Sequence, residues 1–225
     1  LAHLVHQRTG AVLPSQSRLC GEALERAAFD AIAAAVARQI TMPSEPRRAA
    51  ILQDQVIWVT CPVRIDLAGG WSDTPPICNE VGGAVLNAAV KLNGQYPVQV
   101  VAKLSERRSL TLTSLDLGER VEVRHTPGPA EYRDPSQWYA LAKAALVLSG
   151  ACPADPERKL VEWLDVLGGG LDITMFAAVP KGSGLGTSSI LGAAMIACMA
   201  RLFGEAVNRE TIIARTSLLE QMMTT

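Results

Sequence analysis

The stretch that decides the fold of this chain reads Pro180-Lys181-Gly182-Ser183-Gly184-Leu185-Gly186-Thr187-Ser188-Ser189. It follows an apolar run rich in β-forming residues, Leu171 to Val179, and precedes a longer run rich in Ala, Met and Leu, Ile190 to Phe203. These compositions predict a strand, a turn and a helix. Glycines at every second position permit positive φ and close approach of a ligand, and their N–H groups can converge on an anion at the positive end of the helix dipole. The turn therefore predicts a phosphate-binding loop.

Three hydroxyls, those of Thr187, Ser188 and Ser189, fall in the first turn of the predicted helix. There, one hydroxyl can cap free N–H groups, and another can reach a metal ion that bridges phosphates. A Walker A loop is excluded because Thr187 follows Gly186 directly, without the required lysine. A dinucleotide fingerprint is disfavoured because its spacing is Gly-x-Gly-x-x-Gly rather than Gly-x-Gly-x-Gly. A glycine-rich turn with a hydroxyl cap and no ligand is the plain structural alternative.

A second informative segment lies earlier in the chain. Val56 to Val59 predicts one strand, and Pro62 to Leu67 predicts another in which apolar and charged residues alternate. The alternation places Arg64 and Asp66 on the same face of the strand, where the simplest interpretation is a salt bridge on a solvated surface.

The turn that follows this strand, Ala68 to Pro76, combines glycines, an indole, a carboxylate and two prolines. The carboxylate of Asp73 can accept two sugar hydroxyls, and the indole of Trp71 can cover the apolar face of a pyranose. The turn therefore suits a carbohydrate, although Asp73 and Thr74 could instead only fix the turn.

Both segments carry a family resemblance. Pro180 to Ser189 resembles the second motif of the galactokinase/homoserine kinase/mevalonate kinase/phosphomevalonate kinase superfamily (GHMP kinases), with Thr187 in place of a serine and Ile190 in place of a small residue. Pro62 to Pro76 resembles the first motif in the version found in L-fucokinases and in bacterial bifunctional fucokinase/fucose-1-phosphate guanylyltransferases. Trp71 and the double proline distinguish it from the galactokinase and heptose-phosphate kinase versions. The resemblance covers roughly Val56 to Thr225.

This resemblance implies transfer of the γ-phosphoryl group of ATP to the anomeric hydroxyl of L-fucose, with magnesium as the metal. It implies a charge-stabilising catalytic role for Arg64 and magnesium ligation by Ser188 and Glu220. The remaining implied contacts are to the sugar, from Asp73, Trp71, Gly70 and Asp66, and to ATP, from Lys181, Gly182, Ser183, Gly184, Leu185, Gly186, Thr187, Ser188 and Ser189.

The resemblance also implies an α+β fold, with a mixed β-sheet packed with helices. We expect residues 1–50 to form a helical connector, with its helix from Glu22 to Ile40, and residues 51–225 to form the N-terminal part of the kinase domain. The C-terminal domain and the catalytic aspartate would lie beyond Thr225, so the fragment alone would be inactive. A fused upstream guanylyltransferase domain is a further expectation from the bifunctional relatives.

Between the two motifs, the sequence predicts structure rather than chemistry. A strand is expected from Val85 to Leu92, and a hairpin from Leu110 to Val123 that turns at Asp116-Leu117-Gly118. A helix is expected from Ser136 to Leu148, with Trp138 on an apolar stripe that favours core packing over a cofactor site. No site is assigned between residues 104 and 170. A last helix is expected from Arg209 to Met223.

Composition narrows the partners and the compartment. The net charge of −1 without a dense basic cluster argues against nucleic acid and anionic membranes, and no apolar run is long enough to span a bilayer. Five cysteines without a Cys-x-x-Cys pair indicate reduced, buried thiols. We therefore expect a cytoplasmic protein. Two other functions stay open: another GHMP sugar kinase, such as a heptose-phosphate kinase, and a non-catalytic nucleotide- or sugar-binding module.

Overall fold

A computed structural model describes Ala27 and residues 42–73, 77–125, 132, 137–155, 157–180 and 182–224. Five strands form one sheet in the order β1-β4-β7-β5-β6. Strands β5 and β7 pair in parallel, and the other neighbouring pairs are antiparallel, so the sheet is mixed as predicted. The expected hairpin is confirmed as β5 and β6. The bounds are β1 Val56–Cys61, β4 Val98–Ser105, β5 Leu110–Ser114, β6 Glu119–Val123 and β7 Gly170–Ala177.

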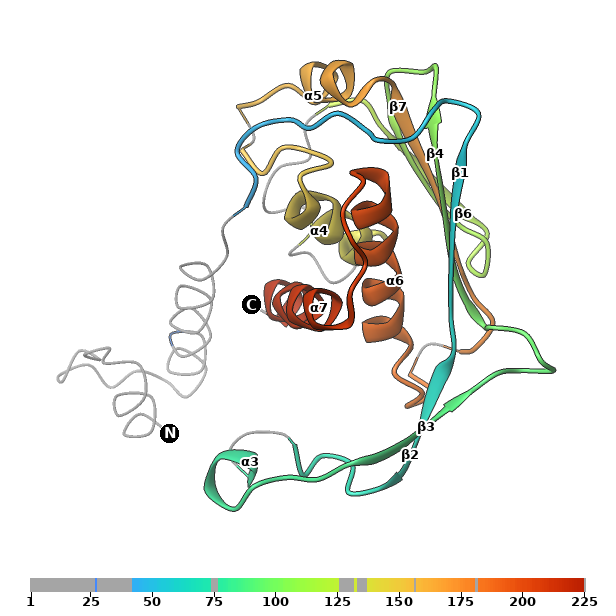
Figure 1. Cartoon of the computed structure of the whole chain (residues 1–225), viewed down its shortest axis with the longest axis vertical. Helices are drawn as coiled ribbons and strands as arrows, with labels where there is room; N and C mark the ends of the chain where they lie inside the picture. Colours follow the sequence, from blue (N-terminus) through green and yellow to red (C-terminus); the bar gives the residue numbers. More distant parts are fainter. Residues whose placement is uncertain are drawn as a thin grey trace, which may run out of the picture.

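Three helices pack together on one face of this sheet: α4 Ala140–Ser149, α6 Thr187–Leu202 and α7 Arg209–Thr224 (Figure 1). Helix α5 Leu160–Leu167 contacts β7. The arrangement confirms the predicted α+β class. Among the described residues, no helix has both the length and the apolar character needed to cross a membrane. The predicted helix from Glu22 to Ile40 lies outside the described residues, apart from Ala27.

The core lies between the sheet and α6. Strand β4 buries every second side chain, including Val100 and Ala102, because successive side chains of a strand point to opposite faces. Helix α6 contacts β1, β4, α4 and α7, which explains why Met195 and Met199 are completely buried. Cys198 is also buried in α6, and burial raises the pKa of its thiol to about 12. Cys198 is therefore a core residue, as predicted, and Cys152 is buried as well. Cys61 and Cys78 are only half-buried, so the prediction of buried thiols does not hold for these two.

Strands β2 Val63–Ala68 and β3 Leu86–Val90 form a separate two-stranded antiparallel arm with an irregularity between Asp66 and Ala68. Figure 1 shows this arm, with the short helix α3 Ile77–Glu80, reaching away from the five-stranded sheet. Val63 is buried, but Ile65 and Leu67 are 40% and 61% exposed. The alternating pattern thus predicts strand β2 correctly. However, described residues cover the apolar side of this strand only at the base of the arm, around Val63.

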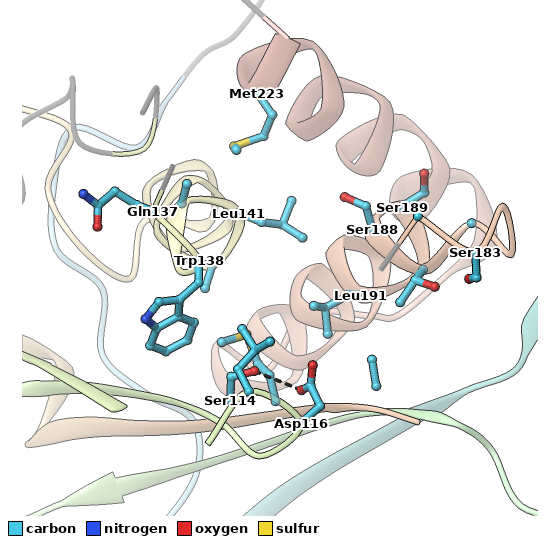
Figure 2. A pocket seen from close by; sticks show the side chains of 18 of the residues that line it. Ser114, Asp116, Gln137, Trp138, Leu141, Ser183, Ser188, Ser189, Leu191 and Met223 are labelled. Atoms are coloured by element: carbon cyan, nitrogen blue, oxygen red, sulfur yellow. Dashed lines mark hydrogen bonds between the residues drawn. The ribbon is translucent and has the colours of Figure 1, made fainter. Parts of the chain in front are cut away.

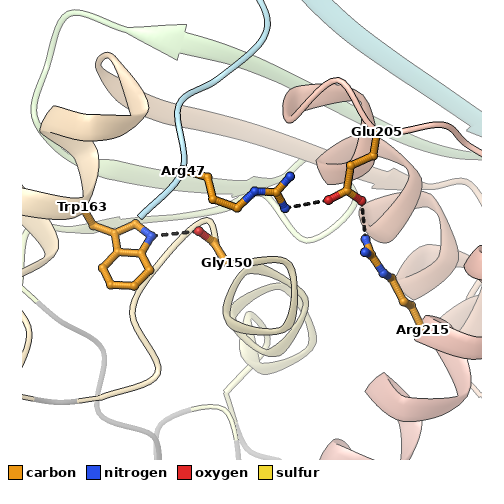
Figure 3. A network of polar contacts seen from close by, with 5 residues as sticks. All are labelled: Arg47, Gly150, Trp163, Glu205 and Arg215. Carbon is orange, nitrogen blue, oxygen red and sulfur yellow. Dashed lines mark hydrogen bonds and ion pairs between the residues drawn. The ribbon is translucent and has the colours of Figure 1, made fainter. Parts of the chain in front are cut away.

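The segment before β1 is tied to the helices by backbone and side-chain contacts. Ala50 N donates to Leu202 O over 2.7 Å at the end of α6. Beside it, Glu205 accepts hydrogen bonds from Arg47 Nη1 at 2.6 Å and from Arg215 Nη1 at 2.7 Å (Figure 3). Glu205 therefore joins three segments: the chain that enters β1, the end of α6 and the first half of α7.

We expect Glu205→Gln to destabilise the fold at neutral pH and to weaken its acid dependence. Burial acts to raise the pKa of the Glu205 carboxyl, but hydrogen bonds from Arg215 and Arg47 outweigh it and hold that pKa below its ordinary value. A depressed folded-state pKa gives stability that is present above the unfolded-state pKa and is lost as the pH falls through the folded-state value. Denaturant unfolding from neutral pH down to about pH 3 measures this loss.

The matched control is Glu162→Gln, because Glu162 is a 66% exposed carboxylate whose ion pair with Lys159 spans 3.9 Å. Exposed pairs contribute little, so this variant should keep the acid dependence of the parent chain. Equal acid dependence in the Glu205 variant and the parent would show that the junction does not stabilise the fold through this carboxylate.

Candidate active site

The predicted phosphate loop connects β7, which ends at Ala177, to α6, which begins at Thr187. Gly182, Gly184 and Gly186 have φ values of 75°, 74° and 69°, a left-handed conformation that side chains disfavour. A Cβ added at Gly182 or Gly184 would meet no described atom within 4 Å. The backbone of the loop is thus open on the side where an anion could approach. Lys181 lies outside the described residues.

The start of α6 differs from expectation in one respect. Its N-cap is Gly186 in the left-handed conformation, and no described side chain caps the helix, so the expected hydroxyl cap is wrong. The first helical bond runs from Ile190 N to Gly186 O, which leaves the earlier N–H groups outside the helical ladder. The Thr187 hydroxyl is buried and has no partner among the described residues. An anion at this helix end could accept from these donors.

Arg64 meets the phosphate loop directly, although the two are far apart in the sequence. Arg64 N donates to Leu185 O over 3.2 Å. A Cβ added at Gly186 would lie 2.7 Å from Arg64 Nε and 3.2 Å from Arg64 Cδ, so the side chain crosses the bare Cα of this glycine. The structure therefore places the first and second sequence motifs in contact.

The sequence also allowed a simple salt bridge between Arg64 and Asp66. The structure contains this ion pair only as a long, partly exposed contact. Arg64 Nε lies 4.0 Å from Asp66 Oδ1, and the two side chains are 48% and 35% exposed. Ion pairs of this kind contribute roughly 0 to 1 kcal/mol. The guanidinium therefore lies beside both the carboxylate of Asp66 and the Cα of Gly186 in the phosphate loop.

The expected sugar-binding turn follows β2 and is held against the chain that enters β3. The Ser72 hydroxyl lies 2.6 Å from Gly69 O and 3.0 Å from Ala84 O, and it accepts from Ala84 N over 3.1 Å. Within this turn Trp71 has φ of 72°, unusual for a bulky residue, and is 81% exposed. The packing thus presents the indole outward.

The other expected sugar ligands lie around this turn. A Cβ on Gly70 would lie 3.4 Å from Asp66 Oδ2, which places Gly70 beside that carboxylate, and Asp73 is exposed. Thr74 to Pro76 lie outside the described residues. All four expected sugar ligands thus lie on the arm that also carries Arg64: Asp66 in β2, and Gly70, Trp71 and Asp73 in the turn after it.

A cavity of about 560 Å³ opens beside the phosphate loop (Figure 2). One end is formed by the loop and the first turn of α6. The other end is formed by the end of β5 and the turn after it, by the turn before α4 and the start of α4, by two residues of β7, and by one residue each of α6 and α7. The lining residues are Gly182, Ser183, Gly184, Gly186, Thr187, Ser188 and Ser189 at the first end, and Ser114, Asp116, Leu117, Gln137, Trp138, Ala140, Leu141, Ala142, Met175, Ala177, Leu191 and Met223 at the second.

Sequence analysis missed this second end, which lies largely within the region where it assigns no site. Helix α4 begins at Ala140, so Trp138 belongs to the preceding turn and not to the helical stripe on which its core assignment depends. Asp116 occupies the hairpin turn, where aspartate is common for structural reasons. The sequence around Trp138 and Asp116 is that of ordinary turns, and nothing in it indicates that either side chain lines a cavity.

Glu220 lies on α7, which packs on α6 through the buried Leu219 and Met222. Its side chain is exposed, and Met223 of the same helix lines the cavity. Among the described residues, no group of three or more His, Cys, Asp and Glu side chains could hold a metal ion. Magnesium fits such a sparse donor set only when phosphate oxygens and water complete its octahedron.

Comparisons with known proteins indicate the family of the chain. Residues 156–224 match the family described as GHMP kinases N terminal domain. The chain is 38% identical over 204 residues to the L-fucokinase/L-fucose-1-P guanylyltransferase of Bacteroides fragilis. The aligned region covers 89% of this chain and 22% of that protein. It is 35% identical over 185 residues to the bifunctional fucokinase/GDP-fucose pyrophosphorylase of Arabidopsis thaliana, with coverages of 81% and 16%. The chain thus spans about a fifth of these curated relatives.

Among solved structures, the galactokinase of Lactococcus lactis complexed with galactose has a TM-score of 0.55 at 22% identity. The match covers 76% of this chain and 39% of that one, and at this identity it concerns the fold alone. The family match, the identity to the curated relatives and the shared fold give one answer: the chain belongs to the GHMP kinases and contains their N-terminal domain.

Proposed function

We propose that this chain is part of a kinase that transfers the γ-phosphoryl group of ATP to the anomeric hydroxyl of L-fucose. One observation carries the proposal: Arg64, at the base of the arm that bears the sugar-binding turn, lies against Gly186 of the phosphate loop. With this contact, a sugar bound on the arm and a nucleotide bound on the loop would lie next to each other at Arg64. The fucokinase names of the two curated relatives support L-fucose as the sugar.

The proposed roles follow from the demands of phosphoryl transfer, which depends on positioning and charge neutralisation more than on covalent chemistry. The loop from Lys181 to Ser189 holds the phosphates, with the free N–H groups at the start of α6 as donors. Arg64 stabilises charge on the transferring group. The sugar is held by Asp66, Gly70, Trp71 and Asp73.

Magnesium, when bound, would neutralise phosphate charge and would be held by Ser188 and Glu220 together with the phosphates. This cation usually binds through few protein ligands and keeps several waters, so these two residues would be enough when phosphates are bound. A fused guanylyltransferase domain upstream is also part of the proposal, since both curated relatives carry a second activity in their names.

The sugar is identified by a panel of substrates. The full-length gene product is incubated with ATP, magnesium and one sugar at a time, and ADP and the sugar 1-phosphate are measured. We expect L-fucose to give the highest kcat/KM. A preference for a heptose phosphate would favour the alternative GHMP kinase, and the absence of ADP with every sugar would favour a non-catalytic binding module.

Arg64→Ala tests the charge-stabilising role. Removal of one such donor typically lowers the rate by about a hundredfold or more, so we expect this loss in kcat with L-fucose. Arg108→Ala is the control, because Arg108 is a 51% exposed arginine whose Nη1 lies 2.7 Å from Asp165 Oδ1 on α5. If the Arg64→Ala variant kept the wild-type kcat, the proposed charge-stabilising role of Arg64 would be wrong.

Gly186→Ala tests the contact between the two motifs. Alanine at this position combines a left-handed backbone with a Cβ that collides with Arg64, whereas Gly184→Ala introduces the same backbone conformation without a described neighbour within 4 Å. We expect Gly186→Ala to reduce kcat/KM about tenfold more than Gly184→Ala, because only the first displaces the guanidinium. Equal losses would mean that only the backbone conformation matters.

A further inference from the structure

The chain makes a tight turn from Gly69 to Ser72, directly after β2. Ser72 N donates to Gly69 O over 3.0 Å, and this bond closes a four-residue β-turn. The third residue of the turn, Trp71, has φ of 72°. A positive φ at this position is characteristic of a type II turn, in which glycine or asparagine normally occurs there. The chain therefore has a bulky indole where a turn of this type favours a small residue.

Packing does not explain the left-handed conformation of Trp71. The residue is 81% exposed, so the indole gains little from burial among the described residues. A left-handed backbone is costly for a bulky side chain, and such outliers persist only where the surrounding structure holds them. Strained residues of this kind are concentrated at functional sites. The conformation therefore points to a use for the exposed indole and to a neighbouring group that holds its backbone.

The Ser72 hydroxyl contacts both the turn and the chain that enters β3. It lies 2.6 Å from Gly69 O, at the first residue of the turn, and 3.0 Å from Ala84 O. It also accepts a hydrogen bond from Ala84 N over 3.1 Å. A hydroxyl has one proton to donate and two lone pairs to accept with, so a single side chain can make these contacts. Ser72 thus connects the turn to itself and to the neighbouring segment.

The backbones on the two sides of this serine touch each other. A Cβ added at Gly69 would lie 1.9 Å from Ala84 O, and one added at Gly83 would lie 2.1 Å from Ser72 O. No side chain fits at either distance, so both positions require glycine. This close approach brings the carbonyls of Gly69 and Ala84 within reach of one hydroxyl.

We propose that Ser72 is a positioning residue that holds Trp71 in its left-handed conformation, so that the indole is presented to the sugar before the sugar binds. This inference rests on the proposed sugar kinase function, and it concerns how the turn is prepared for L-fucose. If the turn left this conformation for part of the time, the apparent affinity would fall by the fraction of molecules that remain competent. Loss of the Ser72 hydroxyl should therefore weaken sugar binding although the hydroxyl does not contact the sugar.

The first test compares Ser72→Ala with the wild-type full-length gene product in the phosphorylation of L-fucose. Loss of a neutral hydrogen bond changes an equilibrium constant by up to about tenfold, so the KM for L-fucose should rise about tenfold. The KM for ATP and the kcat at saturating L-fucose should stay within about twofold of wild type, because the described contacts of the hydroxyl are confined to the arm. General damage to the fold would change all three constants.

A double-mutant cycle with Trp71→Gly tests whether Ser72 acts through Trp71. Glycine adopts the left-handed conformation without support, but it removes the indole, so Trp71→Gly should raise the KM for L-fucose at least as much as Ser72→Ala does. In the Trp71→Gly background, Ser72→Ala should then raise this KM by less than about twofold. Ser105→Ala is the control, because Ser105 Oγ also accepts a backbone amide, from Arg107 N over 3.3 Å, at the end of β4. The control should leave every kinetic constant unchanged.

Hydrogen exchange tests the same coupling without substrate. The amide of residue 72 donates to Gly69 O, so its exchange rate reports how often the turn opens. We expect this rate to rise about tenfold in Ser72→Ala and by less than about twofold when the same change is made in the Trp71→Gly background.

Three kinetic outcomes would overturn the inference while the sugar kinase function stands. These are an unchanged KM for L-fucose in Ser72→Ala, an unchanged KM in Trp71→Gly, and an equal effect of Ser72→Ala in both backgrounds. If no sugar yields ADP, the proposed function fails. Exchange of the residue 72 amide then still decides whether Ser72 holds Trp71.

Discussion

The passage of the Arg64 side chain over the bare Cα of Gly186 is the constraint on which the site depends. The contact requires a glycine for two separate reasons: the backbone is left-handed at φ of 69°, and a Cβ would occupy the place of the guanidinium. Gly182 and Gly184 share only the left-handed backbone, because a Cβ at either position would meet no described atom within 4 Å. The three glycines of the loop are therefore not equivalent, although their spacing in the sequence is regular.

The fold supplies this contact through two different routes. Strand β7 lies in the middle of the five-stranded sheet and is followed directly by the loop and α6, so the predicted phosphate loop is connected to buried elements on both sides. The arm of β2 and β3 is peripheral, but its base is anchored by the buried Val63 and by the bond from Arg64 N to Leu185 O. The loop is thus attached to a central strand and a packed helix, and the arm is attached to the loop at its base.

Much of this arrangement follows from local sequence signals. Alternation predicts the strand that carries Arg64, and the change from β-forming to helix-forming residues predicts the strand, turn and helix around Gly186. The end of the cavity opposite the loop could not be predicted in this way. Trp138 lies only two residues before α4, and Asp116 lies in a hairpin turn, so each has an ordinary local explanation. Only the parallel pairing of β5 with β7 and the packing of α4 on α6 bring them to one cavity.

The weakness of the pair between Arg64 and Asp66 has a consequence for anion binding. A buried, well-formed ion pair would have to be broken before the guanidinium could serve a phosphate, at a cost of several kcal/mol. At 4.0 Å and partial exposure, the existing pair contributes at most about 1 kcal/mol, which is less than a charge-assisted hydrogen bond to phosphate can supply. Asp66 can therefore orient Arg64 in the free protein and still release it to a bound nucleotide. The hydrogen bond from Arg64 N to Leu185 O holds the backbone of Arg64 at the loop, so in the proposed kinase a rotation of the side chain is enough for this exchange of partners.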